Sequence, residues 1–474
     1  MSFKTVPLNI TGPSYQSRSK PLSSQRTVNW YQQLSDGGKE KYVLLPFPGL
    51  KELGSSVEQV DRGFWRMAET LYQVKGTTLY RIDSRGTHTD LGTITGIERC
   101  IMADDGINLF IVSDLKVWHF NSDNDSITQV TDAAITGAIS VDFINNQFIY
   151  TKPDFTTISD VGNGASANSL NQIGAETKPD ALVRDFVFGQ TIYRMGVRTI
   201  EGWYNSGIGN PPIERLDGQI FDVGLAAKNS VAETDEAFYW LGDDNAVYRS
   251  SAGAKQRIST DAISNAIQSY SVVSDAFGYT FTLEGQNFYC LTFPSENQTF
   301  IVNESLANQG WFELSSGIFN DKYQGSSMIN CYNKTIVADA NNGKIYTLDL
   351  DTFTNNDETL KRERVTQAID GKLVGASRRD RLQMSSLNIE METGVGVIQG
   401  QGDDPKIMVE HSDDGGRTWS AGTWARVGRL GEFTLLVNYD NLDTFYSRIF
   451  RISTSDPVNY SVYSASIDLR LAGK

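Results

Sequence analysis

The sequence contains few of the residues on which metal sites, disulfide frameworks and histidine catalysis depend. Its 474 residues include three cysteines and three histidines. Cys100, Cys290 and Cys331 are too few and too scattered for a zinc knuckle or a disulfide framework. No apolar run approaches the roughly 18 residues that span a bilayer, and the N-terminal segment lacks the continuous apolar core of a signal peptide. These absences favour a soluble protein that is made and used without secretion.

Positive charge is also scarce. The chain has 42 Lys and Arg against 57 Asp and Glu, a formal net charge of −15 at pH 7. Binding along nucleic-acid phosphates requires clustered Lys and Arg that displace counterions. Two short basic stretches occur at 361–364 and 378–381, and acidic residues interrupt both. We interpret them as solvated strand ends or protein contacts rather than as a nucleic-acid grip, and we expect no direct DNA binding.

Recognised catalytic motifs are absent as well. The sequence has no H-E-x-x-H, no G-x-S-x-G and no phosphate-binding loop. His88, His119 and His411 stand in contexts typical of strands and turns, and acidic pairs such as Asp104-Asp105 fall in expected turns, where Asp is common. A glycosidase needs only two suitably separated carboxylates, so that possibility stays open. We predict no enzyme activity, no cofactor and no metal site.

What the sequence does contain is a recurring strand-turn-strand pattern from about residue 60 onward. The clearest copy joins 70–74 to 78–82 through Lys75-Gly76, and the next joins 108–112 to 116–120. Further copies begin at residues 146, 186, 237, 287 and 334. Their starts lie about forty to fifty residues apart, which is the spacing of four-stranded propeller blades.

Such a blade is too thin to bury its faces alone, so several must stack around an axis. The pattern therefore predicts an all-β protein with a β-propeller-like body of six or seven divergent blades over 56–355. A twisted array of β-sandwiches is the alternative. One short helix is expected near 260–270, because Ser259, Thr260 and Asp261 offer capping oxygens ahead of an apolar helical face.

The two ends of the chain differ from this body. Residues 1–55 are rich in Pro and Ser and predict an extended N-terminal arm, whose aromatic groups must be buried on its own body or on a neighbouring subunit. Residues 356–474 predict a linker strand and a C-terminal β-sandwich. Within this domain, alternation around Leu387 is clean, and further strands are expected at 406–410, 433–437, 448–452 and 465–469.

The sharpest local motif lies in the expected sandwich. Ser412, Asp414, Gly416, Thr418 and Trp419 match the Asp-box pattern S-x-D-x-G-x-T-W, which resembles the repeated boxes of sialidase propellers. The pattern suits a turn in which the Asp binds backbone amides, the Gly is permissive and the Trp packs beneath. Because the box occurs once, we interpret it as a structural turn.

The order and spacing of segments over most of the chain resemble the packaged-DNA stabilisation proteins, or tail hubs, of short-tailed phages. The segments that carry the resemblance are Val28-Asn29, Phe47-Pro48-Gly49, 259–270, 310–314, 317–325, 387–390 and Thr393-Gly394. The resemblance implies a structural virion protein that is assembled in the host cytoplasm and forms a ring, a hexamer, in the tail. This ring would lie below the portal and its adaptor, hold the tail needle near the tailspikes, and close the channel after packaging.

DNA would then pass an acidic channel at genome ejection without specific binding, and no membrane insertion is expected. Seven residues are candidate assembly contacts: Trp30, Tyr31, Phe47, Pro48, Trp311, Phe319 and Tyr323. Core packing is the competing interpretation, above all for Trp311. Two other functions stay open, namely a sialidase-like carbohydrate-active or carbohydrate-binding propeller and a general interaction propeller of a cell.

Overall fold

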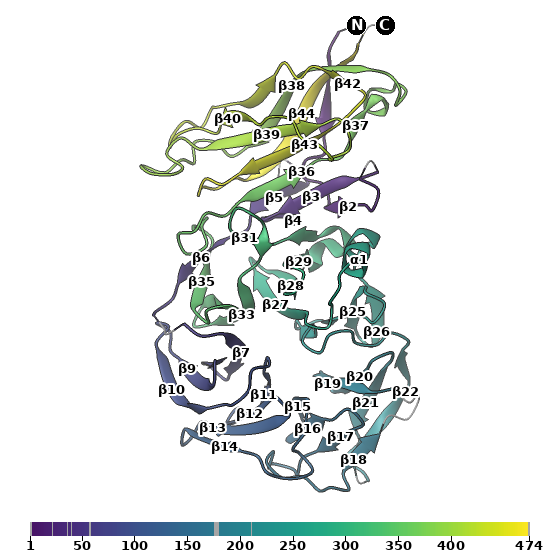
Figure 1. Ribbon diagram of the computed structural model, residues 1–474, viewed down its shortest axis with the longest axis vertical. Coiled ribbons are helices and arrows are strands. Elements are labelled where there is room, and N and C mark those ends of the chain that lie inside the picture. Colours follow the sequence, from purple (N-terminus) through teal and green to yellow (C-terminus); the bar gives the residue numbers. More distant parts are fainter. Residues whose placement is uncertain are drawn as a thin grey trace.

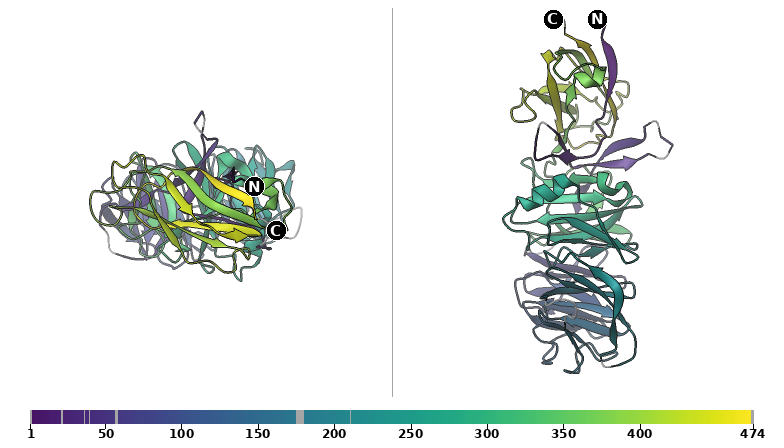
Figure 2. Two further views of the ribbon diagram at one scale, coloured as in Figure 1. Left: turned by 90° about the horizontal axis from the view of Figure 1, so that it is seen from above. Right: turned by 90° about the vertical axis from the view of Figure 1, so that its right-hand side faces the viewer.

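The chain folds into an elongated β structure with a propeller at one end and a sandwich at the other (Figures 1 and 2). The computed structural model describes residues 2–20, 22–35, 37–38, 40–55, 58–174, 180–209 and 211–472. In these residues the helical segments are short: α1 (Asp261–Gln268), η1 (Glu304–Gln309) and η2 (Gly371–Val374). No helix of the described ranges is long and apolar enough to cross a membrane.

The propeller contains six separate antiparallel sheets of four strands each. Their strands are β7 (Asp61–Met67), β8 (Thr70–Lys75), β9 (Thr78–Ile82), β10 (His88–Thr93); β11 (Ile101–Asp104), β12 (Asn108–Ser113), β13 (Lys116–Asn121), β14 (Ser126–Gln129); β15 (Ser140–Ile144), β16 (Gln147–Thr151), β17 (Phe155–Ile158), β18 (Gln172–Gly174); β19 (Leu182–Phe188), β20 (Thr191–Gly196), β21 (Ile200–Asn205), β22 (Ile213–Phe221); β23 (Ala232–Glu233), β24 (Phe238–Leu241), β25 (Val247–Ser251), β26 (Ala254–Arg257); and β33 (Gly325–Cys331), β34 (Lys334–Asp339), β35 (Ile345–Asp349) with β6 (Gly49–Glu52). Consecutive strands pair with their neighbours, as the strand-turn pattern predicts.

A further group of four strands completes the ring but does not stand alone. It comprises β27 (Phe277–Leu283), β28 (Gln286–Phe293), β29 (Gln298–Asn303) and β30 (Trp311–Glu313), and it continues into an 11-stranded sheet. Its inner strand β27 lies beside β23 and β33. The predicted all-β propeller with a C-terminal sandwich is thus confirmed, with six separate blades and this shared sheet in the remaining position. The expected short helix is α1, capped by Thr260.

The ring is closed by a strand from the start of the chain. Strand β6 pairs with β35, with Leu50 opposite Leu348. The loop that follows β35 crosses so close that a Cβ on Gly49 would lie 2.2 Å from the carbonyl oxygen of Thr354. Glycine is therefore required where the closing strand enters the blade.

The sandwich is built from both ends of the chain. One sheet contains β4 (Trp30–Leu34), β5 (Tyr42–Pro46), β44 (Val462–Leu471), β38 (Leu382–Met391) and β41 (Val437–Asp440), with β1 (Lys4–Leu8) and β42 (Thr444–Phe445) at its sides. The other sheet is the rest of the 11-stranded sheet: β3 (Ser24–Val28), β36 (Arg362–Val365), β43 (Ser447–Thr454), β39 (Lys406–Ser412) and β40 (Thr423–Arg426), with β2 (Tyr15–Gln16) and β37 (Ile369–Asp370). The short pair β31 (Ser315–Ser316) and β32 (Asp321–Lys322) lies beyond β30.

The core of the sandwich shows what the predicted arm does. Val6, Leu8 and Trp30 are buried in one apolar cluster with residues from the C-terminal strands, such as Leu387 and Phe450. The segment predicted as an extended arm is thus divided into short strands that pack on the chain's own body.

Candidate interaction surfaces

A single hydrogen-bonded sheet connects the two domains. Strand β3 pairs in parallel with β30 of the propeller and antiparallel with β36 of the sandwich. From β3, the Arg26 guanidinium binds Glu313 through Nε–Oε1 at 2.8 Å and Nη2–Oε2 at 2.6 Å, and reaches Glu363 at 3.3 Å. The bidentate fork and the shared sheet fix the angle between the domains.

The junction also contains a buried carboxylate and a buried amide. Although burial opposes ionisation of Glu363, the nearby charges of Arg26 and Lys361 lower its pKa below the ordinary value. The Asn29 Nδ2 donates to the carbonyl oxygens of Ser315 and Lys361 at 3.1 and 2.7 Å, and its Oδ1 accepts from the Ser315 N–H at 2.9 Å. Because these hydrogen bonds of Asn29 connect segments that are far apart in the sequence, they make the junction one rigid unit.

The predicted assembly contacts lie almost entirely inside the chain. Trp30 is buried in the sandwich core, where its Nε1 donates to the carbonyl oxygen of Tyr460 at 2.9 Å. Trp311 is buried beside α1 and donates to the carbonyl oxygen of Ile258 at 2.8 Å.

A second group of these residues forms an aromatic cluster at the start of the closing strand. Tyr31, Phe47 and Tyr323 belong to one buried apolar cluster, and Pro48 is buried beside it. The six buried side chains are therefore used by the chain's own core. Among the seven predicted contacts, Phe319 alone is open to another molecule, with 83% of its surface exposed.

Four of the exposed apolar side chains lie close together at one end of the sandwich. Ile398, Leu430, Phe433 and Leu436 are between 61% and 87% exposed. They lie on two loops that touch each other, because Thr393 Oγ1 donates to the Phe433 carbonyl oxygen at 3.0 Å. We call these four residues the apolar loop end. The strand predicted at 433–437 is wrong for 433–436, which lie in a turn and loop, because β41 begins only at Val437.

A groove lies at the opposite end of the sandwich. It has a volume of about 830 Å³ and is bordered by the β2–β3 hairpin, by Thr260 at the start of α1, and by sandwich residues that include Ala368 and Ser447. The hairpin adds the exposed side chain of Leu22. Figure 1 shows β40, next to the apolar loop end, on the left of the sandwich and β2 and β37 on the right. The two surfaces therefore face in different directions.

The Asp-box forms the loop between β39 and β40. One carboxylate oxygen of Asp414 accepts from the N–H groups of Arg417 and Thr418 at 2.8 and 3.0 Å, and the other accepts from Thr418 Oγ1 at 2.7 Å. These hydrogen bonds, led by those from Thr418, hold the pKa of Asp414 well below its ordinary value. Ser412 Oγ accepts from the Gly416 N–H at 2.8 Å, and Trp419 stacks against the Arg451 guanidinium at 4.3 Å. Ser412 and Asp414 thus make these hydrogen bonds within the motif's own loop.

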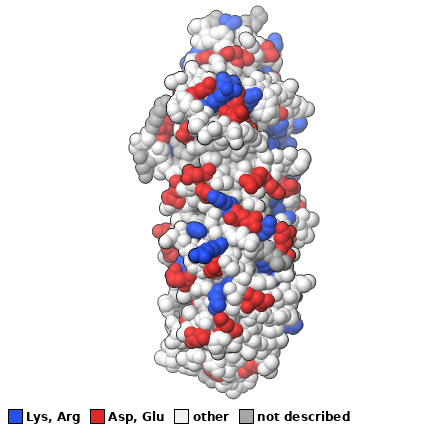
Figure 3. All heavy atoms as spheres, turned by 90° about the vertical axis from the view of Figure 1, so that its left-hand side faces the viewer, with Lys and Arg blue, Asp and Glu red and all other residues white. Residues whose placement is uncertain are grey.

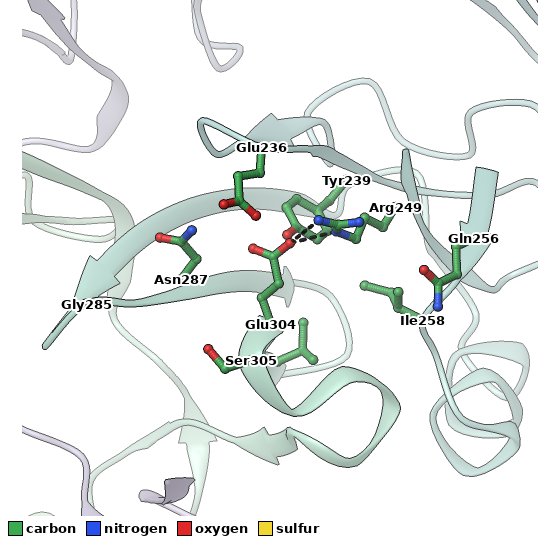
Figure 4. Close-up of a pocket in the computed structure, with 10 residues that line it drawn as sticks. Glu236, Tyr239, Arg249, Gln256, Ile258, Gly285, Asn287, Glu304 and Ser305 are labelled. Carbon is green, nitrogen blue, oxygen red and sulfur yellow. Dashed lines mark hydrogen bonds and ion pairs between the residues drawn. The ribbon is translucent and has the colours of Figure 1, made fainter. Parts of the chain in front are cut away.

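A cavity of about 450 Å³ lies between two neighbouring propeller units (Figure 4). The carboxylate of Glu304 is held by Arg249 at 2.6 Å, and Tyr239 points to the same place. Burial first, and then the nearby Glu304, raise the pKa of Tyr239 well above its ordinary range, so it does not act as a base near neutral pH. The charges of Glu304 and Arg249 therefore already compensate each other. In the described part of the chain, no group of three or more His, Cys, Asp or Glu is arranged to hold a metal.

One carboxylate inside the propeller has an unusual protonation. Asp142 accepts from the N–H groups of Phe143 and Val187 at 2.8 and 2.9 Å. Burial nevertheless raises its pKa to about 6. The charge at this position in the middle of β15 therefore changes just below neutral pH.

Basic and acidic side chains alternate along the face shown in Figure 3, and no broad field of one sign covers it. A DNA-binding protein would need a continuous basic surface to contact the phosphates, and this face has none.

Two family models match the chain. The model described as "Bacteriophage P22 Gp10, beta-propeller" matches residues 4–353, and the model described as "Bacteriophage P22 Gp10, beta-sandwich" matches residues 369–470. No curated protein matches the sequence.

Three solved structures that match parts of the chain have TM-scores below 0.5 and low sequence identity. The WD40 domain of Neurospora crassa Pan2 has a TM-score of 0.42 at 9% identity, covering 63% of this chain and 95% of that one. BamB from Moraxella catarrhalis has a TM-score of 0.38 at 9% identity, covering 73% and 96%. The computationally designed protein Ika8 has a TM-score of 0.39 at 12% identity, covering 68% and 99%.

Proposed function

Since this chain belongs to the family of phage stabilisation proteins that includes bacteriophage P22 Gp10, a structural family of the virion, we propose that it is the hub of a short phage tail. In this role it forms a ring below the portal and its adaptor, holds the tail needle and lies near the tailspikes. The ring closes the channel after packaging and so stabilises the packaged DNA. Family membership over both domains is the observation that carries the proposal.

The two surfaces of the sandwich support the ring. An exposed apolar patch with no partner in its own chain favours contact with another molecule. Here an apolar loop end and a groove face away from each other on one domain. When unlike surfaces of identical subunits meet head to tail, the assembly closes into a ring if the rotation between subunits permits it. The rigid junction at Arg26 keeps every propeller at the same angle to that ring.

The charge of the chain supports passage of DNA without adhesion. With a net charge of −15, a ring of copies repels the phosphate backbone, whereas a basic lumen would retain it. Basic side chains lining the lumen of the assembled ring would contradict this part of the proposal.

The ring can be tested by light scattering coupled to size-exclusion chromatography. The wild-type chain should assemble into a ring, and the paired change Phe433→Ser with Leu436→Ser at the apolar loop end should leave it monomeric. Ala368→Arg in the groove should have the same effect. The matched control Leu170→Ser replaces an exposed apolar residue of the propeller and should leave assembly unchanged.

A mixture of the two monomeric variants gives the sharper result. Each variant retains one intact surface, so an equimolar mixture should form a one-to-one dimer that cannot grow. Rings that persist in both variants would show that other surfaces join the subunits. A wild-type chain that stays monomeric at all concentrations would contradict the ring itself, and turnover of a fluorogenic sialoside would favour the sialidase-like alternative.

A further inference from the structure

A polar cavity lies where the propeller ring closes. Its volume is about 560 Å³, within the usual range for small-molecule sites. Its wall is formed by the β28–β29 and β34–β35 turns, by the β31–β32 pair and by the loop after β35. Among the described residues of this wall, Tyr346 is the one aromatic, and the others are charged, amide or hydroxyl side chains.

The charged groups of this cavity are largely compensated. Lys344 Nζ lies 3.5 Å from Glu52 and 3.3 Å from Glu58. The Asp321 carboxylate accepts from Asn297 Nδ2 at 2.9 Å, and Asp339 accepts from the N–H group of Asn341 at 2.8 Å. These contacts leave only a small excess of carboxylates in the wall.

One amide side chain in the wall has free hydrogen-bonding groups. Asn355 is only 2% exposed, and neither Oδ1 nor Nδ2 of its side chain has a hydrogen-bond partner among the described residues. Its backbone is fixed, because its N–H donates to the Glu358 carbonyl oxygen and its carbonyl accepts from the Glu358 N–H, both at 3.0 Å. Buried amides are normally paired, so an unpaired one in the wall of a cavity has hydrogen-bonding capacity that a bound ligand or an ordered water can take up.

The free groups define the ligand. An amide offers an acceptor and a donor side by side, which is the complement of two neighbouring hydroxyl groups. An apolar ligand does not suit the polar wall, and an anion does not suit four carboxylates against two ammonium groups. No metal cluster occurs among the described residues. We propose that this cavity binds a neutral polyhydroxylated ligand, a pyranose unit of a saccharide, through Asn355.

Saturation-transfer difference NMR with the full-length chain tests the proposal. The probes are D-glucose, D-galactose, D-mannose, L-rhamnose and N-acetyl-D-glucosamine, each alone. We expect transfer to at least one of them, with binding at least tenfold weaker in Asn355→Leu. The variant Gln324→Ala, at another position of the wall, should also weaken binding and decides the question if Asn355→Leu does not fold.

The matched control is Asn287→Leu, which removes an amide from the 450 Å³ cavity between the propeller units and should leave binding unchanged. Absence of transfer from all five sugars to the wild-type chain would overturn the proposal. Equal transfer in the wild type and in both wall variants would overturn it as well, as would loss of binding in Asn287→Leu alone. None of these results depends on ring formation, so the tail-hub proposal stands or falls separately.

Discussion

Removal of residues 1–48 should unfold the sandwich while the propeller keeps its blades. The deleted segment contains β1 and the strands β3, β4 and β5, whereas a chain that begins at Gly49 retains the closing strand β6. An independent arm could be removed without loss of either domain. The structure instead places strands from this segment in both sheets of the sandwich.

The size of the effect follows from the buried side chains. Val6, Leu8, Ile10, Trp30 and Leu44 from this segment are buried in the sandwich core. Burial of a side chain of this kind contributes about 1.5–3 kcal/mol, so the five together contribute about 10 kcal/mol. The whole stability of a domain is about 5–15 kcal/mol. The remaining C-terminal strands should therefore be unable to hold the sandwich fold.

Limited proteolysis with mass spectrometry, together with calorimetry, measures the outcome. The truncated chain should yield a resistant propeller fragment and lose the fragment that covers 369–470. As a graded version, Trp30→Ala in the full chain should cost about 3–5 kcal/mol, whereas Leu34→Ala, at a partly exposed position of the same strand, should cost little. A truncated chain that retains a resistant sandwich with unchanged melting would refute this reasoning.

Three further predictions concern single positions. Gly49→Ala should lower the free energy of unfolding in urea by about 1–3 kcal/mol, because the new Cβ would meet the Thr354 carbonyl oxygen; an unchanged midpoint would contradict the close approach. Because the pKa of Asp142 is raised to about 6, the folded chain binds this proton more tightly, and stability should rise as the pH falls from 7 to 5. Asp142→Asn should flatten that part of the melting profile. Arg26→Met should cost about 3 kcal/mol at pH 7, and the difference from the wild type should shrink in acid, once the pH falls below the lowered pKa of Glu363; a constant difference would exclude the ion pair as its cause.

The sequence predicts the propeller well because its signals are local. A blade is a series of adjacent hairpins, so its strands and turns lie within a few tens of residues. The Asn145-Asn146 turn illustrates this, since both residues have positive φ, as tight hairpins require. The cap of α1 at Thr260 is likewise predictable from four adjacent residues. Local pattern and final structure agree in these places.

The remaining parts depend on contacts between distant segments. The composition of residues 1–55 indicates an extended chain, but whether Trp30 meets a neighbour or its own body depends on strands more than 300 residues away. Exposure of Phe433 and Leu436 is equally hidden, because a short apolar run such as 433–437 is also typical of a buried strand. Nor does a sequence pattern reveal that Asn355 is buried without a partner, since this depends on which side chains fail to reach it.

The closing strand has a consequence for the newly made chain. Strand β6 is synthesised early, yet its partner β35 follows almost 300 residues later, and β44, the partner of β1, follows later still. At about 5–20 residues per second, these first strands wait roughly 15 to 90 s on the ribosome before they can pair. Unpaired strand edges are prone to aggregate, and proline and other poorly pairing residues reduce that hazard. The proline-rich and serine-rich composition of the first residues can thus be understood as protection of the nascent chain until its last strands emerge.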